Sequence, residues 1–540
     1  MDKIGDIYEA FLVSDYPFPE KEYFYNHVFK NYYEAAEYAI SNFTLDIDPA
    51  TIRRVKNILR EYHKRLGLLT PKVEENIENI ENGVVLAGHQ SIIFGGAGLI
   101  ANKITTVVNI ANISSKIGHK LTPTFFINTH DGFHSEIGTI HLPVKQSGTS
   151  KSISLKDYPY GIVLDKIKTN NYHWLEKNLS LIGNIFSEFS SLISTEKRKL
   201  FNERVQHIIT FLRETYRTSA NLGEWNALIW GIQANILNDW GVVFIPSSNK
   251  ELKQLKAKAY KVFLEKREQY IKEFNRATKK IKKMDLKPTT PVKKEDYVPF
   301  FYECPNDGYR VVLSYSERNG KIFLEGKCPL DKESYQITLN KNDIDLSDYA
   351  ESLSPRLDTN QATIQSFLPV VIRVSGPGEI NYNAQVIPAN RAIGIKLPIY
   401  VKYTRMLYNT PWIEQLSKTE ELKNYSIFSS DFFRALGKLA KAKRKEDKGV
   451  IKESYKAITR AIKKAIKELR ITNSASNTSI SKYRSWQFGM FDKHHNWQEV
   501  SWPWFIMASI TGLNDYLSTY RRYYTLHSLT GHIGYLNTQL

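Results

Sequence analysis

Cysteine is scarce in this sequence, and several other features are missing altogether. The 540 residues include two cysteines, Cys304 and Cys328, so a framework of disulfide bonds cannot hold the fold together. No apolar run reaches the roughly 18 residues needed to cross a bilayer. Residues 1–6 show neither a basic start nor an apolar block that would indicate a signal peptide. These absences predict a cytoplasmic protein that has no membrane partner.

The sequence is rich in apolar residues and in positive charge. Hydrophobic residues make up 42% of the chain and aromatic residues 12%, which favours a folded protein. The net charge of +18 comes mainly from residues 251–290, with 13 Lys/Arg against 5 Asp/Glu, and from residues 431–470, with 14 against 5. We interpret both segments as helices with solvated basic faces. A surface that steers an anionic small molecule is the second interpretation. Nucleic-acid binding is the third, because no recognition motif accompanies the charge.

Strands and helices alternate between about residue 80 and residue 420. Short apolar strands are predicted near residues 83–87, 121–128, 241–245, 370–374 and 396–402. A helix over residues 97–117 joins the first two strands, and this unit predicts an α/β fold with a parallel sheet. In such sheets ligands bind beyond the carboxyl ends of the strands. Residues 297–340 alternate like an antiparallel meander.

The first candidate ligand loop follows the first strand, in the stretch "VVLAGHQSIIFGGAGLIANK" (84–103). Glycines let a backbone approach a ligand, and the next helix offers free N–H groups to an anion. The stretch is neither G-x-G-x-x-G nor a Walker A sequence, so a structural turn between buried elements is an equal alternative.

Two further stretches follow later strands. "NTHDGFHSE" (128–136) brings histidines and carboxylates to a strand end, where they could do acid–base work or form a solvated polar loop. In "SGPGEINYNAQ" (375–385), Pro377 rigidifies a turn and Glu379 enters a helix near its positive end. We expect Tyr382 and Gln385 on the same helix face as Glu379, forming a substrate-binding edge; the alternative is an ordinary helix start with an acidic first turn.

A matched pair of Cys-Pro-x-Asp sequences lies in the meander. They have the form of a zinc ribbon in which the second cysteine of each knuckle has become aspartate. We predict a metal-free relic held by its β-hairpins, with Cys304 against Cys328. The weak candidates for metal ligands are Cys304, Asp307, Cys328 and Asp331.

Taken together, these stretches resemble the bacillithiol biosynthesis protein BshC family of cysteine-adding enzymes. "GHQSIIFGGAGLIANK" is similar to the family's Gly-Gln-Gln…Phe-Thr-Gly-Pro…Lys stretch, and "PTFFINTHDGFHSEI" looks like its second strand and acidic end. "SGPGEINYNAQ" resembles the signature Gly-Gly-Pro-Gly-Glu-Ile-x-Tyr-x-Ala-Gln. The order and spacing of these motifs hold from about residue 80 to residue 415.

The resemblance implies a Rossmann-like core with inserted connecting segments and a helical coiled-coil region that dimerises. It also implies the joining of cysteine to glucosaminyl malate through an amide bond, the last step of bacillithiol synthesis. ATP is the natural activating co-substrate for a free carboxylate, with ADP as a ligand. Two alternatives stay open: a nucleotidylyl transferase of unknown substrate, and a basic non-catalytic protein that binds nucleic acid.

The resemblance further implies site residues. The binding set is Gly88, His89, Gln90, Gly96, Lys103, Gly376, Pro377, Gly378, Tyr382, Gln385 and Arg405, and the catalytic set is Asp131, Glu379 and His130. Lys103 or Arg405 would neutralise an anionic ligand. Asp131 or Glu379 would orient the cysteine amine or take its proton.

Some positions depart from the family pattern. His89 replaces a glutamine, Ala97 replaces a proline, and Asn360 with Gln361 stands where the family has Arg-Pro. These departures indicate that the substrate could be a related amino acid or sugar acid.

From these patterns we divide the chain into five segments. They are a helical part of the core (1–80), the first part of the Rossmann-like core with a helical insertion (81–295), a β-rich ribbon-like insertion (296–345), the second part of the core (346–420) and a helical coiled-coil region (421–540). In the last segment Ile451, Tyr455, Ile458, Ile462, Ala465 and Leu469 step by four and three, as a heptad seam does. This seam is our candidate for the dimer interface.

Overall fold

The computed structural model describes most of the chain up to residue 412 and selected parts beyond it. The described ranges are 18–43, 47–145, 150–408, 410–412, 434–435, 438–439, 441–442, 447–471, 498–526, 533–536 and 540. Among the described helices, none combines the length and the apolarity required to span a bilayer.

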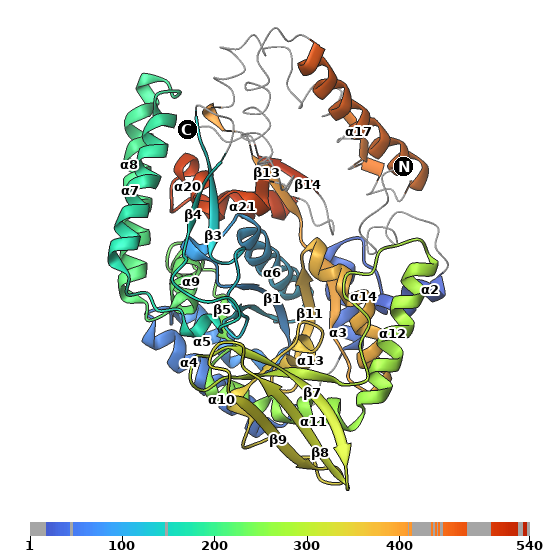
Figure 1. Cartoon of the computed structure of the whole chain (residues 1–540). Coiled ribbons are helices and arrows are strands. Elements are labelled where there is room, and N and C mark those ends of the chain that lie inside the picture. The colour runs from blue at the N-terminus through green and yellow to red at the C-terminus, as the bar shows by residue number, and fades with distance from the viewer. Residues whose placement is uncertain are drawn as a thin grey trace.

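A five-stranded parallel sheet forms the centre of the molecule (Figure 1). Its strands are β1 (Val84–Gln90), β2 (Thr122–Asn128), β5 (Val243–Pro246), β11 (Val370–Ser375) and β12 (Ile399–Lys402). Their spatial order is β12-β11-β1-β2-β5, and every neighbouring pair is parallel. The chain therefore builds outward from β1 in one direction and then in the other, which is the Rossmann arrangement with its switch point between β1 and β11. All five predicted strands are confirmed.

Helices cover both faces of this sheet. Val85, Ala87 and Ile127 face the cluster that contains α3 (Tyr32–Asn42), α6 (Leu99–Lys116) and α9 (Leu222–Gly231). The alternate residues Val84 and Leu86 face the cluster that contains α4 (Pro49–Arg65), α5 (Pro71–Glu78) and α13 (Asn360–Gln365). Because neighbouring strand residues point to opposite sides, a continuous apolar strand supplies both interfaces.

The first insertion lies between β2 and β5. It comprises the hairpin β3 (Thr139–Pro143) and β4 (Ser150–Ser154), then α7 (Tyr172–Ser190), α8 (Thr195–Thr218) and α9. The α7–α8 pair runs along the left edge of Figure 1. Short turns of 3-10 or π-helix occur at Ile80–Asn82, Ile93–Gly95, Leu164–Lys166, Ile232–Ile236 and Ala350–Ser352.

The second insertion lies between β5 and β11. It begins with α10 (Lys250–Leu255), α11 (Ala257–Glu265) and α12 (Arg267–Lys283). An antiparallel sheet follows, made of β6 (Tyr297–Glu303), β7 (Arg310–Arg318), β8 (Lys321–Lys327), β9 (Ser334–Asn340) and β10 (Leu353–Pro355), in the order β10-β6-β7-β8-β9. The predicted meander is confirmed, and β7 to β9 project at the bottom of Figure 1.

The basic helices α10 to α12 do not simply present a solvated face. Lys253 is buried and lies 2.8 Å from Glu303, and the buried Lys256 Nζ donates to the Ser247 carbonyl at 3.1 Å. The Arg267 guanidinium lies over an aromatic ring of the β-sheet insertion. The interpretation of residues 251–290 as one solvated face is therefore wrong in part, because these cations join the helices to the rest of the molecule.

The C-terminal part returns to the core. Its described elements are β13 (Arg405–Tyr408), α17 (Lys448–Ile471), α19 (Gln498–Ser501), α20 (Trp504–Thr511), α21 (Tyr516–Leu526) and β14 (Ile533–Leu536). Trp504 and its neighbours in α20 belong to the main core cluster. The prediction of helix to the end of the chain is wrong at β14, which pairs in parallel with β13 and so supplies its backbone with hydrogen-bond partners.

Near the N-terminus, α2 (Phe18–Tyr25) packs with α12 and with α14 (Pro377–Ala392). The helix predicted from the heptad spacing is confirmed as α17, at the upper right of Figure 1. Ile451 is buried there, while the seam positions from Ile462 onward lie outside the described side chains.

Candidate active site

A cleft opens at the switch point of the parallel sheet. The chain leaves β1 for α6 on one face and leaves β11 for α14 on the other, so the two helices diverge and a crevice forms between them. The cavity has a volume of about 320 Å³ and is lined by His89, Gln90, Leu99, Lys103, Asn128, His130, Asp131, Pro355, Arg356, Leu357, Asn360, Arg373, Gly376, Pro377, Gly378, Glu379, Tyr382, Tyr403 and Val500. Most of the predicted site residues therefore meet here.

Lys103 of α6 connects the two sides of the crevice. Its Nζ donates to the Gly88 carbonyl at 2.7 Å and to Glu379 Oε1 at 2.8 Å, and the side chain is 3% exposed. The other carboxylate oxygen of Glu379 accepts from the Gly376 N–H at 2.8 Å, as in a capping box. Lys103 thus ties the end of β1 to the start of α14.

The charges of this pair are coupled. Burial works to raise the pKa of Glu379, but the nearby Lys103 and Arg373 outweigh it and hold that pKa below the usual value. Burial lowers the pKa of Lys103, and Glu379 opposes that effect. Glu379 is therefore ionised and engaged at both oxygens, and its geometry suits a positioning role better than proton transfer.

Arg373 is a cleft residue that the sequence analysis missed. It lies in β11, is buried, and its Nη1 atom has no hydrogen-bond partner among the described residues. Gly88 makes room for it, because an added Cβ at Gly88 would lie 2.8 Å from the Phe126 carbonyl oxygen and 3.4 Å from Arg373 Nη2. A signal was present: an arginine interrupts the otherwise apolar strand "VVIRVS".

His130 and Asp131 lie at the carboxyl end of β2. Asp131 Oδ1 is 3.4 Å from Arg310 Nη1 and 3.8 Å from His130 Nε2, and 22% of its side chain remains exposed. Burial, with added repulsion from Lys256 and Arg310, holds the pKa of His130 well below its usual range. His130 is therefore neutral, and its Nδ1 atom has no partner among the described residues.

His89 is a second neutral histidine in the cleft wall. Burial, followed by the nearby positive charge of Lys103, lowers its pKa to about 3. The substitution of histidine for the family's glutamine therefore adds no positive charge to the site.

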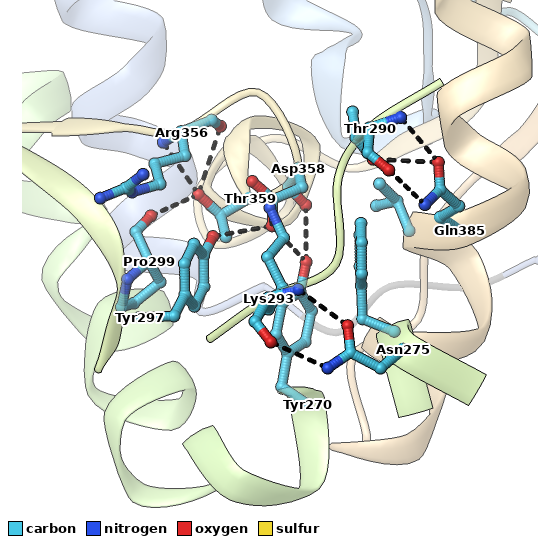
Figure 2. A network of polar contacts seen from close by, with 12 residues as sticks. Tyr270, Asn275, Thr290, Lys293, Tyr297, Pro299, Arg356, Asp358, Thr359 and Gln385 are labelled. Carbon is cyan, nitrogen blue, oxygen red and sulfur yellow. Dashed lines mark hydrogen bonds and ion pairs between the residues drawn. The ribbon is translucent and has the colours of Figure 1, made fainter. Parts of the chain in front are cut away.

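A loop between β10 and α13 contributes Arg356 and Leu357 to the cleft, and Asn360, the first residue of α13, lines it too. Figure 2 shows how this loop is held. Thr359 Oγ1 donates to the Pro299 carbonyl at 2.6 Å and accepts from the Arg356 N–H at 3.1 Å. The loop is thereby fixed to β6, and the sequence analysis identified neither Arg356 nor this support.

A buried carboxylate anchors the same loop from below. Asp358 accepts hydrogen bonds from Tyr297 at 2.7 Å and from Tyr270 at 2.9 Å, and it pairs with Lys293 at 2.9 Å (Figure 2). The Asn275 side-chain amide donates to the Lys293 carbonyl and accepts from the Lys293 N–H, both at 2.8 Å, which fixes the linker that follows α12. This network is a support for Arg356, not part of the cleft surface.

The first turn of α14 faces open space. An ideal Cβ at Gly378 would meet no atom within 4 Å, so the described residues leave space beside this glycine. The positive end of a helix favours an anion. Tyr382 lies one turn further along the cleft wall, and burial raises the pKa of its hydroxyl, which keeps it protonated.

Four predicted site residues do not line the cleft. Gly88 lies behind its wall, where its carbonyl accepts from Lys103, and the other three lie away from it. Gly96 packs against Ile92 and Ile100, Gln385 binds Thr290, and Arg405 pairs with the buried Glu499. The prediction that Gln385 shares a face with Glu379 is wrong, because six residues at about 100° each turn it well away from that face. The start of the loop from Gly88 to Gly98 therefore forms part of the cleft wall, at His89 and Gln90, whereas its later part is a turn packed in the core.

The cleft wall carries more positive than negative charge. Three cations line it, Lys103, Arg356 and Arg373, together with two carboxylates, Asp131 and Glu379. Polar atoms of Asn128, His130, Arg356, Asn360 and Arg373 have no partner within the described part of the chain. The guanidinium nitrogens are donors, whereas the amide oxygens of Asn128 and Asn360 are acceptors. Because buried polar groups require partners, these atoms indicate a polar ligand that carries both acceptors and donors.

The four ribbon residues form a separate cluster outside the cleft. One ligand atom from each of Cys304, Asp307, Cys328 and Asp331 lies within 4.8 Å of all the others. Each thiol contacts the aspartate of the opposite knuckle, with Cys304 to Asp331 at 3.0 Å and Cys328 to Asp307 at 3.3 Å.

Comparison with known proteins agrees with this arrangement. The family model described as bacillithiol biosynthesis BshC, N-terminal Rossmann-like domain, matches residues 10–404. A "Putative cysteine ligase BshC" from Carboxydothermus hydrogenoformans is 23% identical over 458 residues, which span 82% of this chain and 75% of that protein. Proteins of the same name from Staphylococcus aureus and Staphylococcus epidermidis are 22% and 21% identical, over 69% and 70% of this chain.

The two staphylococcal alignments span 63% and 65% of those relatives, slightly less than two thirds of their length. The family match nevertheless covers well over half of the present chain, including both sides of the cleft. The chain belongs to the BshC family of bacillithiol biosynthesis proteins.

Proposed function

We propose that this chain is a ligase that joins cysteine to glucosaminyl malate, or a related amino acid to a related sugar acid, through an amide bond. The observation that carries the proposal is the set of three cations and two carboxylates at the switch point of a BshC-family core. The name of the relatives, cysteine ligase, supports the same reaction class.

The cations suit the acid part of the substrate. Malate carries two carboxylates, and arginine binds a carboxylate through two parallel hydrogen bonds. Arg373 and Arg356 each have a nitrogen without a partner in the described structure, and both line the cavity. We assign the malate carboxylates to these two side chains.

The carboxylates suit the amine. Because the cysteine carboxylate becomes the amide carbonyl, the attacking amine belongs to the glucosaminyl group and not to cysteine, as the resemblance had suggested. This amine must be unprotonated to attack, so a proton must leave its nitrogen. Asp131 is partly exposed to the cavity, whereas Glu379 is engaged by Lys103 and by the Gly376 N–H. We assign proton acceptance to Asp131, and we assign to Glu379 the positioning of Lys103 and of the α14 N-terminus.

One oxygen of the cysteine carboxylate must leave when the amide forms, and a free carboxylate has no good leaving group. We propose ATP as the co-substrate that converts this oxygen into one. The space beside Gly378 at the positive end of α14 supports a phosphate position there.

Two departures from the family pattern concern substrate choice. Asn360 stands where the family has arginine, and His89 stands where it has glutamine; both line the cleft. The change at Asn360 removes a positive charge from the wall. We propose that the sugar-acid substrate differs from glucosaminyl malate in the group that lies against this position.

The reaction is tested by mass spectrometry on the purified full chain incubated with cysteine and glucosaminyl malate, with and without ATP. We expect the amide product in the tube that contains ATP, and we expect Arg373→Gln to raise the KM for the sugar acid. A product that forms equally well without ATP would reject ATP as co-substrate. Formation of no amide with this substrate or with related sugar acids would reject the ligase assignment.

We also propose that the chain forms a homodimer through α17. The helix has an apolar stripe that begins at Ile451, which packs against Leu439 and Ala442 of the same chain, and continues through the partly buried Tyr455 and Ile458. A helix with one long apolar stripe is stabilised when a second helix covers it.

A further inference from the structure

The two Cys-Pro-x-Asp turns of the β-rich insertion have the same backbone structure. In each, the cysteine carbonyl accepts from the N–H four residues later, with Gly308 to Cys304 at 2.8 Å and Lys332 to Cys328 at 3.1 Å. Each cysteine N–H donates to the carbonyl five residues later, at 2.8 and 2.9 Å. Gly308 and Lys332 both adopt left-handed backbone, with φ of 76° and 67°. A lysine rarely adopts this conformation, so the second turn is shaped for a reason other than local preference.

The two turns point their side chains at one another. The four ligand atoms of Cys304, Asp307, Cys328 and Asp331 lie within 4.8 Å of one another. Two thiol–carboxylate contacts, at 3.0 and 3.3 Å, cross from one turn to the other. A tetrahedral zinc ion with bonds of about 2.0–2.3 Å holds its ligands roughly 3.3–3.8 Å apart. The cluster therefore needs to contract by about 1 Å at its widest.

Further groups orient these ligands. The Leu330 N–H points at Cys328 Sγ at 3.4 Å, and the Asn306 side chain donates to Asp331 at 2.9 Å. The Tyr335 hydroxyl lies 3.2 Å from Cys304 Sγ and 3.1 Å from Asp331 Oδ2. Outer partners of this kind fix the ligands of structural metal sites.

In place of the metal-free relic predicted from the sequence, we propose that Cys304, Asp307, Cys328 and Asp331 bind one Zn²⁺ ion and form a structural metal site. Two sulfur ligands select a borderline-soft cation over Mg²⁺ or Ca²⁺. The exchange is balanced: two thiol protons leave, one divalent cation enters, and the charge of the cluster is unchanged. Two carboxylates bind zinc less strongly than two further thiolates would, so the site is weaker than a four-cysteine ribbon.

The site also has a place in the architecture of the cleft. The Gly308 carbonyl accepts from the Val163 N–H at 2.9 Å, and the Arg310 N–H donates to the Gly161 carbonyl at 3.0 Å. Arg310 then pairs with Asp131. Zinc would thus stiffen the turn from which Arg310 reaches the cleft, while remaining outside the cleft itself.

The test uses the full chain, free of any affinity tag, kept reduced, stripped of metal and then dialysed against ZnCl₂. We expect one zinc per chain by elemental analysis and a higher melting temperature than in the stripped protein. Cobalt(II) in place of zinc should give the intense sulfur-to-cobalt absorption of thiolate ligands. Asp331→Asn and Cys304→Ser should each lose the ion, whereas Asp348→Asn, which alters an exposed carboxylate of the same insertion, should retain it.

Zinc that remains at one ion per chain in both Asp331→Asn and Cys304→Ser would overturn the proposal, because the ion would then bind elsewhere. If those variants fail to fold, the cobalt spectrum of the unmodified chain decides, and a spectrum without sulfur-to-cobalt absorption rejects the site. Neither readout depends on ligase activity, so the metal site can fail while the proposed reaction stands.

Discussion

At the scale of single residues, the two acidic side chains of the cleft differ in what surrounds them. Glu379 is bonded at both oxygens, to Lys103 and to the Gly376 N–H, and it stabilises the start of α14. Asp131 has one ion pair at 3.4 Å and keeps part of its surface toward the cavity. A side chain that must exchange a proton with a substrate needs such access.

Replacing Asp131 by asparagine keeps the size of the side chain and removes its basicity. We expect the Asp131→Asn variant to lose about 10²–10⁴-fold in kcat, the range typical of a lost general base. The melting temperature should change little, because the Arg310 guanidinium can still bond the amide oxygen. The rate of amide formation and a thermal melt check both expectations.

The matched control is Glu136→Gln, five residues along the same loop, where the carboxylate is exposed and does not line the cavity. Its kcat should be that of the unmodified chain. Equal activities of the Asp131→Asn variant and this control would show that Asp131 is not the proton acceptor.

Local sequence predicted the residues that lie in motifs, but not those brought in by tertiary structure. Asp131 and Glu379 adjoin glycines just after strand ends, Lys103 lies in the helix that follows the first glycine loop, and all three line the cavity. Arg356 belongs to a loop whose position depends on distant elements, so no local pattern placed it. Gln385 was misplaced because a spacing of six residues ends roughly 120° away from the starting direction on a helix, so it does not share a face with Glu379.

At the scale of secondary-structure elements, the linker between α12 and β6 acts as a strap. Lys293 in this linker pairs with Asp358 of the Arg356 loop, and both side chains are largely buried. Although burial works to raise the pKa of Asp358, Lys293 and Tyr297 together lower it, so the carboxylate is ionised. This linker therefore connects α12 and the β6 sheet to the Arg356 loop through the ion pair between Lys293 and Asp358.

Removing the cation should weaken this connection. We expect Lys293→Met to lower the free energy of unfolding by about 3 kcal/mol, because it leaves a buried carboxylate without its partner. The KM for the sugar acid should rise severalfold as Arg356 loses its support. Urea unfolding and steady-state kinetics measure the two effects.

Lys294→Met is the control, since the neighbouring lysine is exposed and makes no side-chain contact that the structure describes. It should match the unmodified chain in both measurements. A Lys293→Met variant with unchanged stability would contradict the strap.

A second link joins α4 to the edge strand β5. His63 Nδ1 lies 2.7 Å from the Leu59 carbonyl, and Nε2 accepts from the Phe244 N–H at 2.9 Å, which fixes the neutral tautomer. Burial lowers the pKa of His63 from 6.5 to about 4. Below pH 6.5 the unfolded chain binds a proton that the folded chain does not, so stability falls as the pH falls from 6.5 toward 4.

Between pH 7 and pH 5 this histidine should remove about 2 kcal/mol of stability. We expect the His63→Gln variant to be less stable than the unmodified chain at pH 7. Because glutamine does not titrate, its free energy of unfolding should fall by about 2 kcal/mol less than that of the unmodified chain between pH 7 and pH 5. The exposed His119→Gln serves as the control and should follow the unmodified chain. Urea unfolding at both pH values measures the difference, and equal pH dependence in His63→Gln and the unmodified chain would contradict the role of His63.

The parallel sheet was predictable at this scale because its strands are short, apolar and bounded by glycine or proline. The hairpin of β3 and β4 was not, since its alternation is weak and its strands rest on other elements. The same holds for β14, whose four residues become a strand through pairing with β13, far away in sequence. Tertiary pairing decides such segments.

At the scale of the whole molecule, the charge on α17 opposes the association that its apolar stripe favours. Residues 448–471, which form α17, carry 8 Lys/Arg against 2 Asp/Glu. Two such helices would repel one another at low ionic strength, and salt would screen this repulsion. A dimer held by the stripe should therefore be tighter in high salt, whereas binding of nucleic acid by the same helix would weaken.

Substitution of Ile458 and Ile462 by aspartate tests the stripe directly. Each of the two paired helices would then carry two charges in the buried interface, and the cost of burying them would exceed the gain from the apolar contacts. The variant should therefore have the mass of a monomer, whereas the unmodified chain should have the mass of a dimer. Thr459→Asp, on an exposed position of the same helix, adds charge outside the stripe and should leave the dimer intact. Light scattering at low and high salt gives the masses. A dimer that survives both isoleucine changes would place the interface elsewhere, and a chain that is monomeric without any change would mean that the stripe is covered by its own chain.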